Sequence, residues 1–174
     1  MNLTKLARKA IEKYFDGEIY DPDAKTKQKY TKKGACFITL TKNWELRGCV
    51  GSLSAHQQLY KDVIRNAINA AFKDYRFEPL HKTEMSSIKI EVSVLTIPKD
   101  LQYKNENDLL SKLNPSMGLI LEKYNHSATF LPQVWTDLPD KKEFLEELSL
   151  KAGLDRNDWK SSHYKYYRVK KYKE

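Results

Sequence analysis

The segment from Leu46 to Ser52 constrains the fold more than any other part of the chain. It places Cys49 between two glycines, Gly48 and Gly51, inside a stretch that otherwise has the composition of a β-strand. Glycine weakens a strand interior, so the pair predicts that a ligand or another part of the backbone approaches this strand closely. Arg47 stands two residues before the cysteine. The segment therefore predicts a site without identifying its chemistry.

The residues around this segment predict an antiparallel hairpin with strands at 35–41 and 45–51 and a turn at Asn43-Trp44. This register pairs Ile38 with Cys49 and places Arg47 and Cys49 on one face. A type I′ turn requires positive φ at both central residues, which tryptophan resists, so a longer turn and a register shift of one residue are the alternative. Both strand faces carry apolar residues, which predicts a sheet covered on both sides. An enclosed Arg47 then needs an acidic or ligand partner.

Apolar spacing along the rest of the chain predicts helices interleaved with strands. We expect helices at 3–15, 54–74 and 108–113 and between Asp140 and Gly153, strands at 88–94, 117–123 and 127–131 and at the C-terminus, and a loop at 21–33. No linker separates these elements. The expected fold class is α+β, a mainly antiparallel sheet covered by helices on both faces, with residues 1–174 forming one compact domain that has room for two lobes.

Composition excludes several classes of protein. The longest apolar runs are far shorter than a membrane span, and the N-terminus enters a charged amphipathic pattern with no signal-peptide core. Two cysteines provide no disulfide framework, and no Cys/His cluster has the spacing of a zinc site. We therefore expect a cytoplasmic protein with no metal site and no membrane association.

The formal net charge of +8 raises the question of nucleic-acid binding. Much of the excess lies in residues 163–174, where lysines and an arginine alternate with tyrosines. Such a segment can bind single strands through phosphate contacts and base stacking. The alternative is a terminal edge strand whose lysines discourage aggregation, and the absence of known nucleic-acid-binding motifs favours it.

Several ordered sequence blocks give the chain a resemblance to the AMMECR domain family. They are Gly34-Ala35-Cys36-Phe37-Ile38-Thr39-Leu40, the hallmark Leu46-Arg47-Gly48-Cys49-Val50-Gly51, Asp74-Tyr75-Arg76-Phe77-Glu78-Pro79-Leu80, Ile90-Glu91-Val92-Ser93-Val94-Leu95, Leu131-Pro132-Gln133-Val134-Trp135, and Phe144-Leu145 with Lys151-Ala152-Gly153-Leu154. The resemblance spans nearly the whole chain. Val50 replaces a usual isoleucine, Trp44 a usual glycine of the turn, and Tyr75 and Glu78 usual prolines.

The resemblance implies an α+β fold with an antiparallel sheet between helices, and it supplies no established reaction or cofactor. Prokaryotic members are often encoded beside a Memo-like protein and a radical SAM enzyme. The resemblance therefore implies these two kinds of protein as partners in a shared pathway.

Cys49 is the one candidate for a catalytic residue, as a nucleophile whose pKa is lowered by Arg47 or by glycine N–H groups. The alternative is a small cysteine packed under a helix. Arg47 is either a clamp for a carboxylate or phosphate group or one half of a structural ion pair with Glu91 or Asp74.

The other candidate binding residues flank this strand or lie in the family blocks. Asp74 and Arg76 form either a binding pair on a loop or a couple that holds a turn, while Gln133 and Trp135 follow a strand, where pocket rims often occur. Trp135 is more typical of a core residue. The full set of binding candidates is Arg47, Gly48, Gly51, Ser52, Asp74, Arg76, Glu91, Gln133 and Trp135.

These residues favour a protein that binds a small anionic ligand or substrate in a pocket around the strand from Arg47 to Gly51. The sequence leaves open whether the chain is an enzyme. An adaptor for Memo-like and radical SAM proteins is the first alternative. A nucleic-acid-binding module that uses the basic C-terminal strand is the second.

Overall fold

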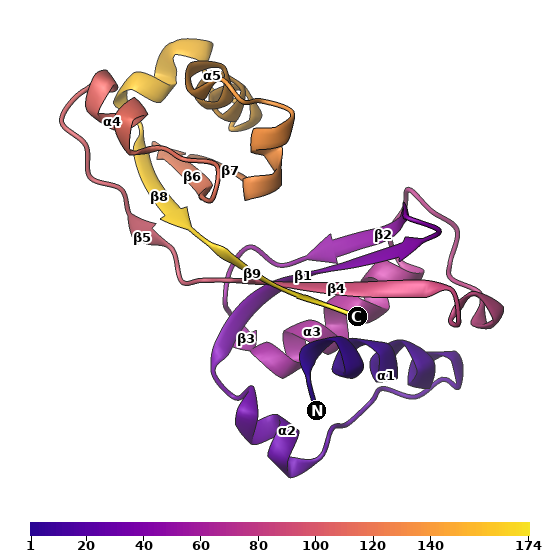
Figure 1. The fold of residues 1–174 in the computed structure, drawn as a ribbon. Helices are drawn as coiled ribbons and strands as arrows, with labels where there is room; N and C mark the ends of the chain where they lie inside the picture. Colours follow the sequence, from indigo (N-terminus) through magenta and orange to yellow (C-terminus); the bar gives the residue numbers. More distant parts are fainter. The chain divides into compact units, whose positions relative to one another are not determined.

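The computed structural model describes all 174 residues, which form two compact units, each with its own sheet (Figure 1). The first unit comprises Met1–Leu95 together with Lys170–Glu174, and the second comprises Thr96–Val169. The α+β class with antiparallel strands is confirmed. No helix has both the length and the apolar content to cross a membrane.

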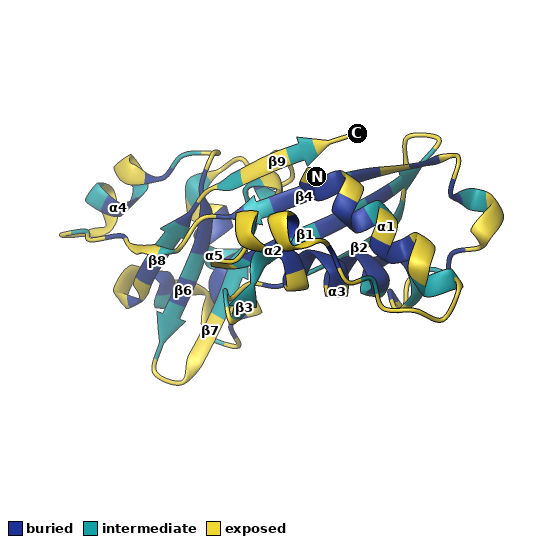
Figure 2. Cartoon of the chain, turned by 90° about the horizontal axis from the view of Figure 1, so that it is seen from below, coloured by how far each residue is buried: buried dark blue, intermediate teal, exposed yellow.

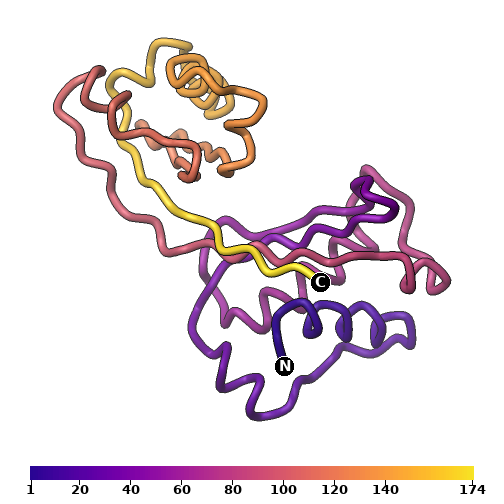
Figure 3. Tube along the Cα trace, viewed as in Figure 1, coloured from indigo at the N-terminus to yellow at the C-terminus, as the bar shows by residue number.

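The first unit combines helices with one sheet whose main strands follow the order β2-β1-β4-β9, with short β3 pairing with one end of β1. The C-terminal strand β9 lies beside β4, although residues 96–168 separate them along the chain (Figure 3). The elements are α1 (Leu3–Phe15), α2 (Ala24–Lys29), β1 (Lys33–Lys42), β2 (Glu45–Gly51), β3 (Gln57–Gln58), α3 (Leu59–Phe72), the 3₁₀ helix η1 (Lys82–Glu84), β4 (Ile88–Leu95) and β9 (Val169–Lys173).

Helices α1 and α3 pack against the same face of this sheet and form the core of the first unit, whose residues are coloured dark blue in Figure 2. Helix α1 begins as predicted, because the Asn2 side chain accepts the Lys5 N–H at 2.9 Å. The core side of β1 carries Cys36, Ile38 and Leu40. The sequence predicts helices on both faces of one sheet, whereas no helix of the first unit lies on the opposite face.

The hairpin between β1 and β2 turns in two residues, because Asn43 and Trp44 have φ of 52° and 70°. The predicted tight turn at Asn43-Trp44 is therefore confirmed, and its alternative, a longer turn, is wrong. The register shifts between Leu40 and Thr41, which forms a β-bulge around Arg47. Cys49 consequently pairs with Thr39 instead of Ile38. The bulge moves Cys49 to the sheet face that α1 and α3 leave open, so the expectation that it points with Ile38 is also wrong.

The second unit has a sheet of order β5-β8-β6-β7 and a core of its own. In that core the Trp135 ring stacks on Phe144 at a centroid distance of 3.7 Å. The elements are β5 (Lys99–Asp100), α4 (Glu106–Lys112), β6 (Gly118–Lys123), β7 (His126–Phe130), η2 (Pro132–Thr136), α5 (Lys141–Lys151), η3 (Arg156–Ser161) and β8 (His163–Tyr167).

Four sequence-based boundaries need correction. The expected loop at 21–33 contains α2, whose polar turn has no apolar period but is capped by Asp23. Helix α3 begins at Leu59, five residues later than predicted, whereas α4 begins at Glu106, two residues earlier than predicted, after its Asn105 cap. The basic C-terminal segment forms two strands, β8 and β9, which belong to different sheets. In polar segments such as these, the sequence pattern alone does not show where a helix begins or whether a segment forms one strand or two.

Candidate functional site

The close approach that the glycines predict is made by the protein itself. A β-carbon on Gly48 would lie 2.1 Å from the carbonyl oxygen of Ala70, so α3 packs directly on the β2 backbone at this residue. A β-carbon on Gly51 would lie 2.2 Å from Cγ of Phe37, whose ring covers it. Of the two alternatives, a packing element or a ligand, packing accounts for both glycines.

Arg47 is held by a carboxylate, but neither of the predicted partners supplies it. Its Nε and Nη2 donate to the two carboxylate oxygens of Glu84 at 3.1 and 3.0 Å, and Nη1 donates to the Glu78 carbonyl at 2.9 Å. Lys42 also contacts Glu84, at 2.9 Å. The hydrogen bonds from Arg47 lower the pKa of Glu84 to about 2, despite the opposing effect of burial. The guanidinium fork is thereby satisfied inside the fold.

The Asp74–Arg76 couple binds the backbone of the hallmark strand at Cys49. The Cys49 N–H donates to Asp74 at 2.8 Å, and Arg76 donates to the Cys49 carbonyl at 3.1 Å. Arg76 also pairs with Asp74 at 2.7 Å. The Arg76 hydrogen bonds lower the pKa of Asp74 to about 2, with further lowering by the Cys49 N–H against the effect of burial. Because β2 is the outer strand of the sheet, this couple covers an edge that is otherwise open to pairing.

Ser52 belongs to a buried polar network that the sequence pattern does not predict. At its centre is Asp62 of α3, which is fully buried and accepts from the Cys36 N–H at 2.9 Å and the Ser52 hydroxyl at 2.8 Å. Arg65 and Asn66 donate to both Asp62 and Ser52. The sequence feature from which this network could be predicted is that Asp62 and Asn66 interrupt the apolar stripe of α3. Polar residues on a buried helix face predict a satisfied network or a site.

Cys49 and Glu91 share the face of the first sheet that α1 and α3 leave open. The Cys49 Sγ lies 3.5 Å from the Thr39 hydroxyl, and Thr39 is in turn paired across the sheet with Glu91. Lys171 and Lys173 contact the Glu91 carboxylate at 3.1 and 3.2 Å. Burial raises the pKa of Glu91, but the two lysines outweigh it, so the pKa lies below its usual value.

A cavity of about 480 Å³ lies on this face beside the Thr39–Glu91 pair. Its lining includes Thr41 and Trp44 from the hairpin, Lys89 from β4 and Lys173 from β9. We call this surface, defined by Thr39, Thr41, Trp44, Cys49, Lys89, Glu91 and Lys173, the open-face site. Of the predicted site residues, Glu91 lines the cavity, and Cys49 lies beside it through its contact with Thr39.

The two cysteines have opposite surroundings. Cys36 is fully buried, and burial followed by the Asp62 charge raises the pKa of its thiol far above the usual value. Cys49 is only half-buried. The alternative reading of Cys49 as a cysteine packed under a helix therefore describes Cys36 instead.

Gln133 and Trp135 belong to the second unit, whereas the other candidates belong to the first. Trp135 is buried and donates its indole N–H to the Met117 carbonyl at 2.9 Å, which makes it a core residue. Gln133 is exposed in η2. Two tyrosines of the basic C-terminal segment, Tyr164 and Tyr167, are also buried and present no ring for base stacking.

The fold and the site define a class of small α+β protein in which a glycine-flanked cysteine lies on an outer strand fixed to a helix by backbone packing. A family model for AMMECR1 matches residues 4–173, and the chain belongs to this family. The match includes both units.

Relatives and a solved structure agree with this assignment. The Nanoarchaeum equitans protein NEQ441 is 38% identical over 166 residues, covering 91% of this chain and 90% of its own. The Saccharolobus islandicus protein LS215_2104 is 40% identical over 165 residues, covering 90% of this chain and 72% of its own. The crystal structure of the uncharacterised protein PH0010 from Pyrococcus horikoshii superposes with a TM-score of 0.84 at 33% identity, covering 99% of this chain and 89% of that one.

Proposed function

We propose that the chain binds a small anionic ligand at the open-face site. The observation that carries this proposal is the row formed by Cys49, Thr39 and Glu91 on a sheet face that no helix of its unit covers. Arg47, which the sequence favours as the anion clamp, is occupied by Glu84. The clamp in this proposal is instead Lys89 of β4, which pairs with no carboxylate, assisted by Lys173 of β9, which also contacts Glu91.

Charge on this face favours an anion. The cavity lining contains Lys89 and Lys173 together with Glu91 and Glu174. Arg8 engages Glu174, and Lys171 contacts Glu91 from outside the lining, so the positive charges around this face exceed the negative ones. A phosphate or carboxylate group beside Lys89 and Lys173 would complete the charge balance of this surface. The Thr39 and Thr41 hydroxyls offer neutral hydrogen bonds to the same ligand.

Binding has more support than covalent catalysis. The side-chain partner of the Cys49 thiol is the Thr39 hydroxyl, which does not serve as a base near neutral pH. None of the four histidines forms a hydrogen bond with the Cys49 thiol: the rings of His56, His126 and His163 contact Ser54, Ala152 and Asp100, and His81 is the N-cap of η1. In this proposal Cys49 lies at the border of the cavity, next to Thr39, and its thiol reports on ligand binding there.

Protection of Cys49 from alkylation tests the proposal. The native protein is treated with iodoacetamide in the presence of inorganic phosphate, glycerol 3-phosphate or succinate, and the modified peptide is quantified by mass spectrometry. At least one anion is expected to slow the labelling of Cys49 and to raise the melting temperature. The double variant Lys89→Ala/Lys173→Ala should lose both effects, while Lys142→Ala in α5 should keep them. If no anion of these classes protects Cys49 at millimolar concentration, the proposal fails.

A second candidate function is protein interaction through the tip of the first hairpin, and Trp44 favours it. This side chain is 101% exposed at a position where its φ of 70° suits glycine. Leu46 and Leu53 add further exposed apolar surface in the same segment. The Memo-like and radical SAM proteins implied by the family resemblance are the partners to test. Co-purification that is lost in Trp44→Gly would support this candidate, and unchanged recovery of partners would contradict it.

A further inference from the structure

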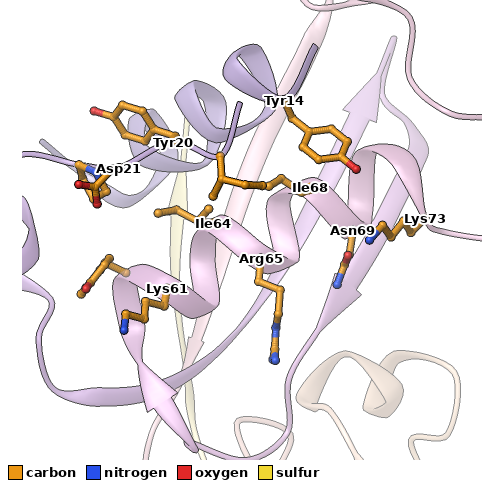
Figure 4. A pocket seen from close by; sticks show the side chains of 12 residues that line it. Tyr14, Tyr20, Asp21, Lys61, Ile64, Arg65, Ile68, Asn69 and Lys73 are labelled. Carbon is orange, nitrogen blue, oxygen red and sulfur yellow. The ribbon is translucent and has the colours of Figure 1, made fainter. Parts of the chain in front are cut away.

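A second cavity of the first unit lies on the helical side, between α3 and the chain that follows α1. Its volume is about 530 Å³, within the range of small-molecule sites. Figure 4 shows Ile64 and Ile68 of α3 pointing toward the segment that carries Tyr20 and Asp21, with Tyr14 of α1 closing one end. We call this cavity the α3 groove.

The α3 groove has an apolar floor with aromatic walls. Tyr60, Ile64 and Ile68 recur at intervals of four residues, so they form one stripe along the helix. Tyr14 is fixed by the Phe72 ring at a centroid distance of 4.8 Å. Ile19, which also lines the groove, is 68% exposed, an unusual state for an isoleucine that has a groove beside it. A flat apolar molecule would cover Ile19 and the floor together.

The outer edge of the α3 groove is cationic. Lys61, Arg65 and Lys73 line it, and Figure 4 shows Lys61 and Arg65 projecting from the same side of α3. The one carboxylate in the lining, Asp21, is already paired with Lys27 at 2.6 Å. The groove therefore has an excess of positive charge beside its apolar floor.

Arg65 is held in place by the buried network described above. Its Nη2 donates to Ser52 at 2.9 Å and to the fully buried Asp62 at 3.1 Å. Its Nε and Nη1 remain available as donors. A guanidinium that is anchored on one side and half-exposed on the other is preorganised to bind an anionic group. Lys61 stands one helical turn away and adds a second charge.

We propose that the α3 groove binds an organic anion with an aromatic body. The ring system lies over Ile64 and Ile68 and covers Ile19, while the anionic group lies between Arg65 and Lys61. The three tyrosines of the lining favour an aromatic ligand over an aliphatic one. The α3 groove is built on the opposite side of the sheet from the open-face site, so this inference stands independently of the proposed function.

A matched pair of probes separates the two parts of this recognition. The aromatic sulfonate 8-anilinonaphthalene-1-sulfonate supplies ring and charge, and N-phenyl-1-naphthylamine supplies the same rings without the sulfonate. Fluorescence titration of the full chain should show binding of both, with the sulfonate bound more tightly. Amide NMR shifts induced by the sulfonate should be concentrated at residues 19–22 and 60–73.

The variants give the decisive comparison. Lys61→Glu should weaken binding of the sulfonate about tenfold and leave the neutral probe within about twofold. Ile19→Ser should weaken both probes. Lys25→Glu, the same charge reversal at an exposed position of α2, and Lys173→Ala at the open-face site should change neither. The proposal is overturned if Lys61→Glu binds the sulfonate as the parent does, if Lys25→Glu weakens it equally, or if the shifts lie outside the α3 groove.

Discussion

Gly48 lies against the backbone of Ala70, so closely that a β-carbon on the glycine would stand 2.1 Å from the Ala70 carbonyl oxygen. This contact joins the hallmark strand to α3 and explains why a residue without a side chain stands there. The neighbour is helix backbone, which cannot move aside as a side-chain tip can. Gly48 is therefore required by packing rather than by backbone torsion.

Gly48→Ala is accordingly expected to destabilise the protein by about 2–4 kcal/mol, because the methyl group forces α3 away from β2. Urea unfolding followed by circular dichroism measures the change. Gly34→Ala is the matched control, since its β-carbon would meet the flexible Leu59 side chain at 3.0 Å. A loss in Gly48→Ala no larger than in the control would contradict the packing role.

Arg47→Ala is expected to cost about 2–3 kcal/mol of stability, because it leaves the Glu84 carboxylate and the Glu78 carbonyl without their donors. Arg47→Lys should recover only part of this, since an ammonium cannot form the two-pronged contact. Chemical denaturation of both variants provides the measurement. Anion protection of Cys49 should survive in Arg47→Lys at a temperature where that variant is folded. If folded Arg47→Lys lost all anion protection of Cys49, Arg47 would be a ligand clamp after all.

Acid should weaken the first unit through two carboxylates. The folded-state pKa of Asp74 is about 2 against an ordinary 3.8, and that of Glu84 is about 2 against 4.5. A lowered folded pKa means that the stabilisation is fully present above the ordinary values and is lost as the pH falls from about 4.5 toward 2. Each group should contribute on the order of 1–2 kcal/mol.

Urea titrations at pH 7, 4.5, 3 and 2.5 test this dependence. Asp74→Asn and Glu84→Gln should each lower stability at pH 7 and flatten its decline with acid. Glu45→Gln, which removes an exposed carboxylate from the same hairpin, should leave the profile unchanged. A parent-like slope in the Asp74→Asn/Glu84→Gln double variant would refute the assignment of acid sensitivity to these groups.

The parts of the fold that sequence predicts well are those set by neighbours along the chain. Helix α1 follows from its Asn2 cap and its apolar period, and α5 follows from Asp140, which caps the Glu143 N–H at 2.9 Å, with Gly153 at φ 77° after its end. The alternation from Ile88 to Val94 likewise predicts β4, which begins at Ile88 and ends at Leu95. In each case the physical cause lies within a few residues.

The site is harder to predict because a single bulge determines it. The β-bulge at Arg47 moves Cys49 from the helix-covered face to the open one, and no local pattern in the segment signals it. The partners that hold the bulge, Glu84 and the Ala70 carbonyl, come from segments more than twenty residues away. The sequence thus locates the strand and its unusual residues, while tertiary contacts decide which of them face solvent.

At Trp44, stability and the proposed binding role favour different residues. A tryptophan at φ 70° in a two-residue turn carries a backbone strain that glycine does not, on the order of 1 kcal/mol. Trp44→Gly should therefore raise the free energy of unfolding by roughly that amount, even though it removes a large apolar side chain, because that side chain is fully exposed and loses no burial. Trp44→Ala retains a β-carbon and should show little gain. Thermal and urea unfolding of the two variants measure the difference. Equal stability in both would mean that the turn carries no strain at Trp44, and would remove the reason for inferring that a binding role retains this side chain at the hairpin tip.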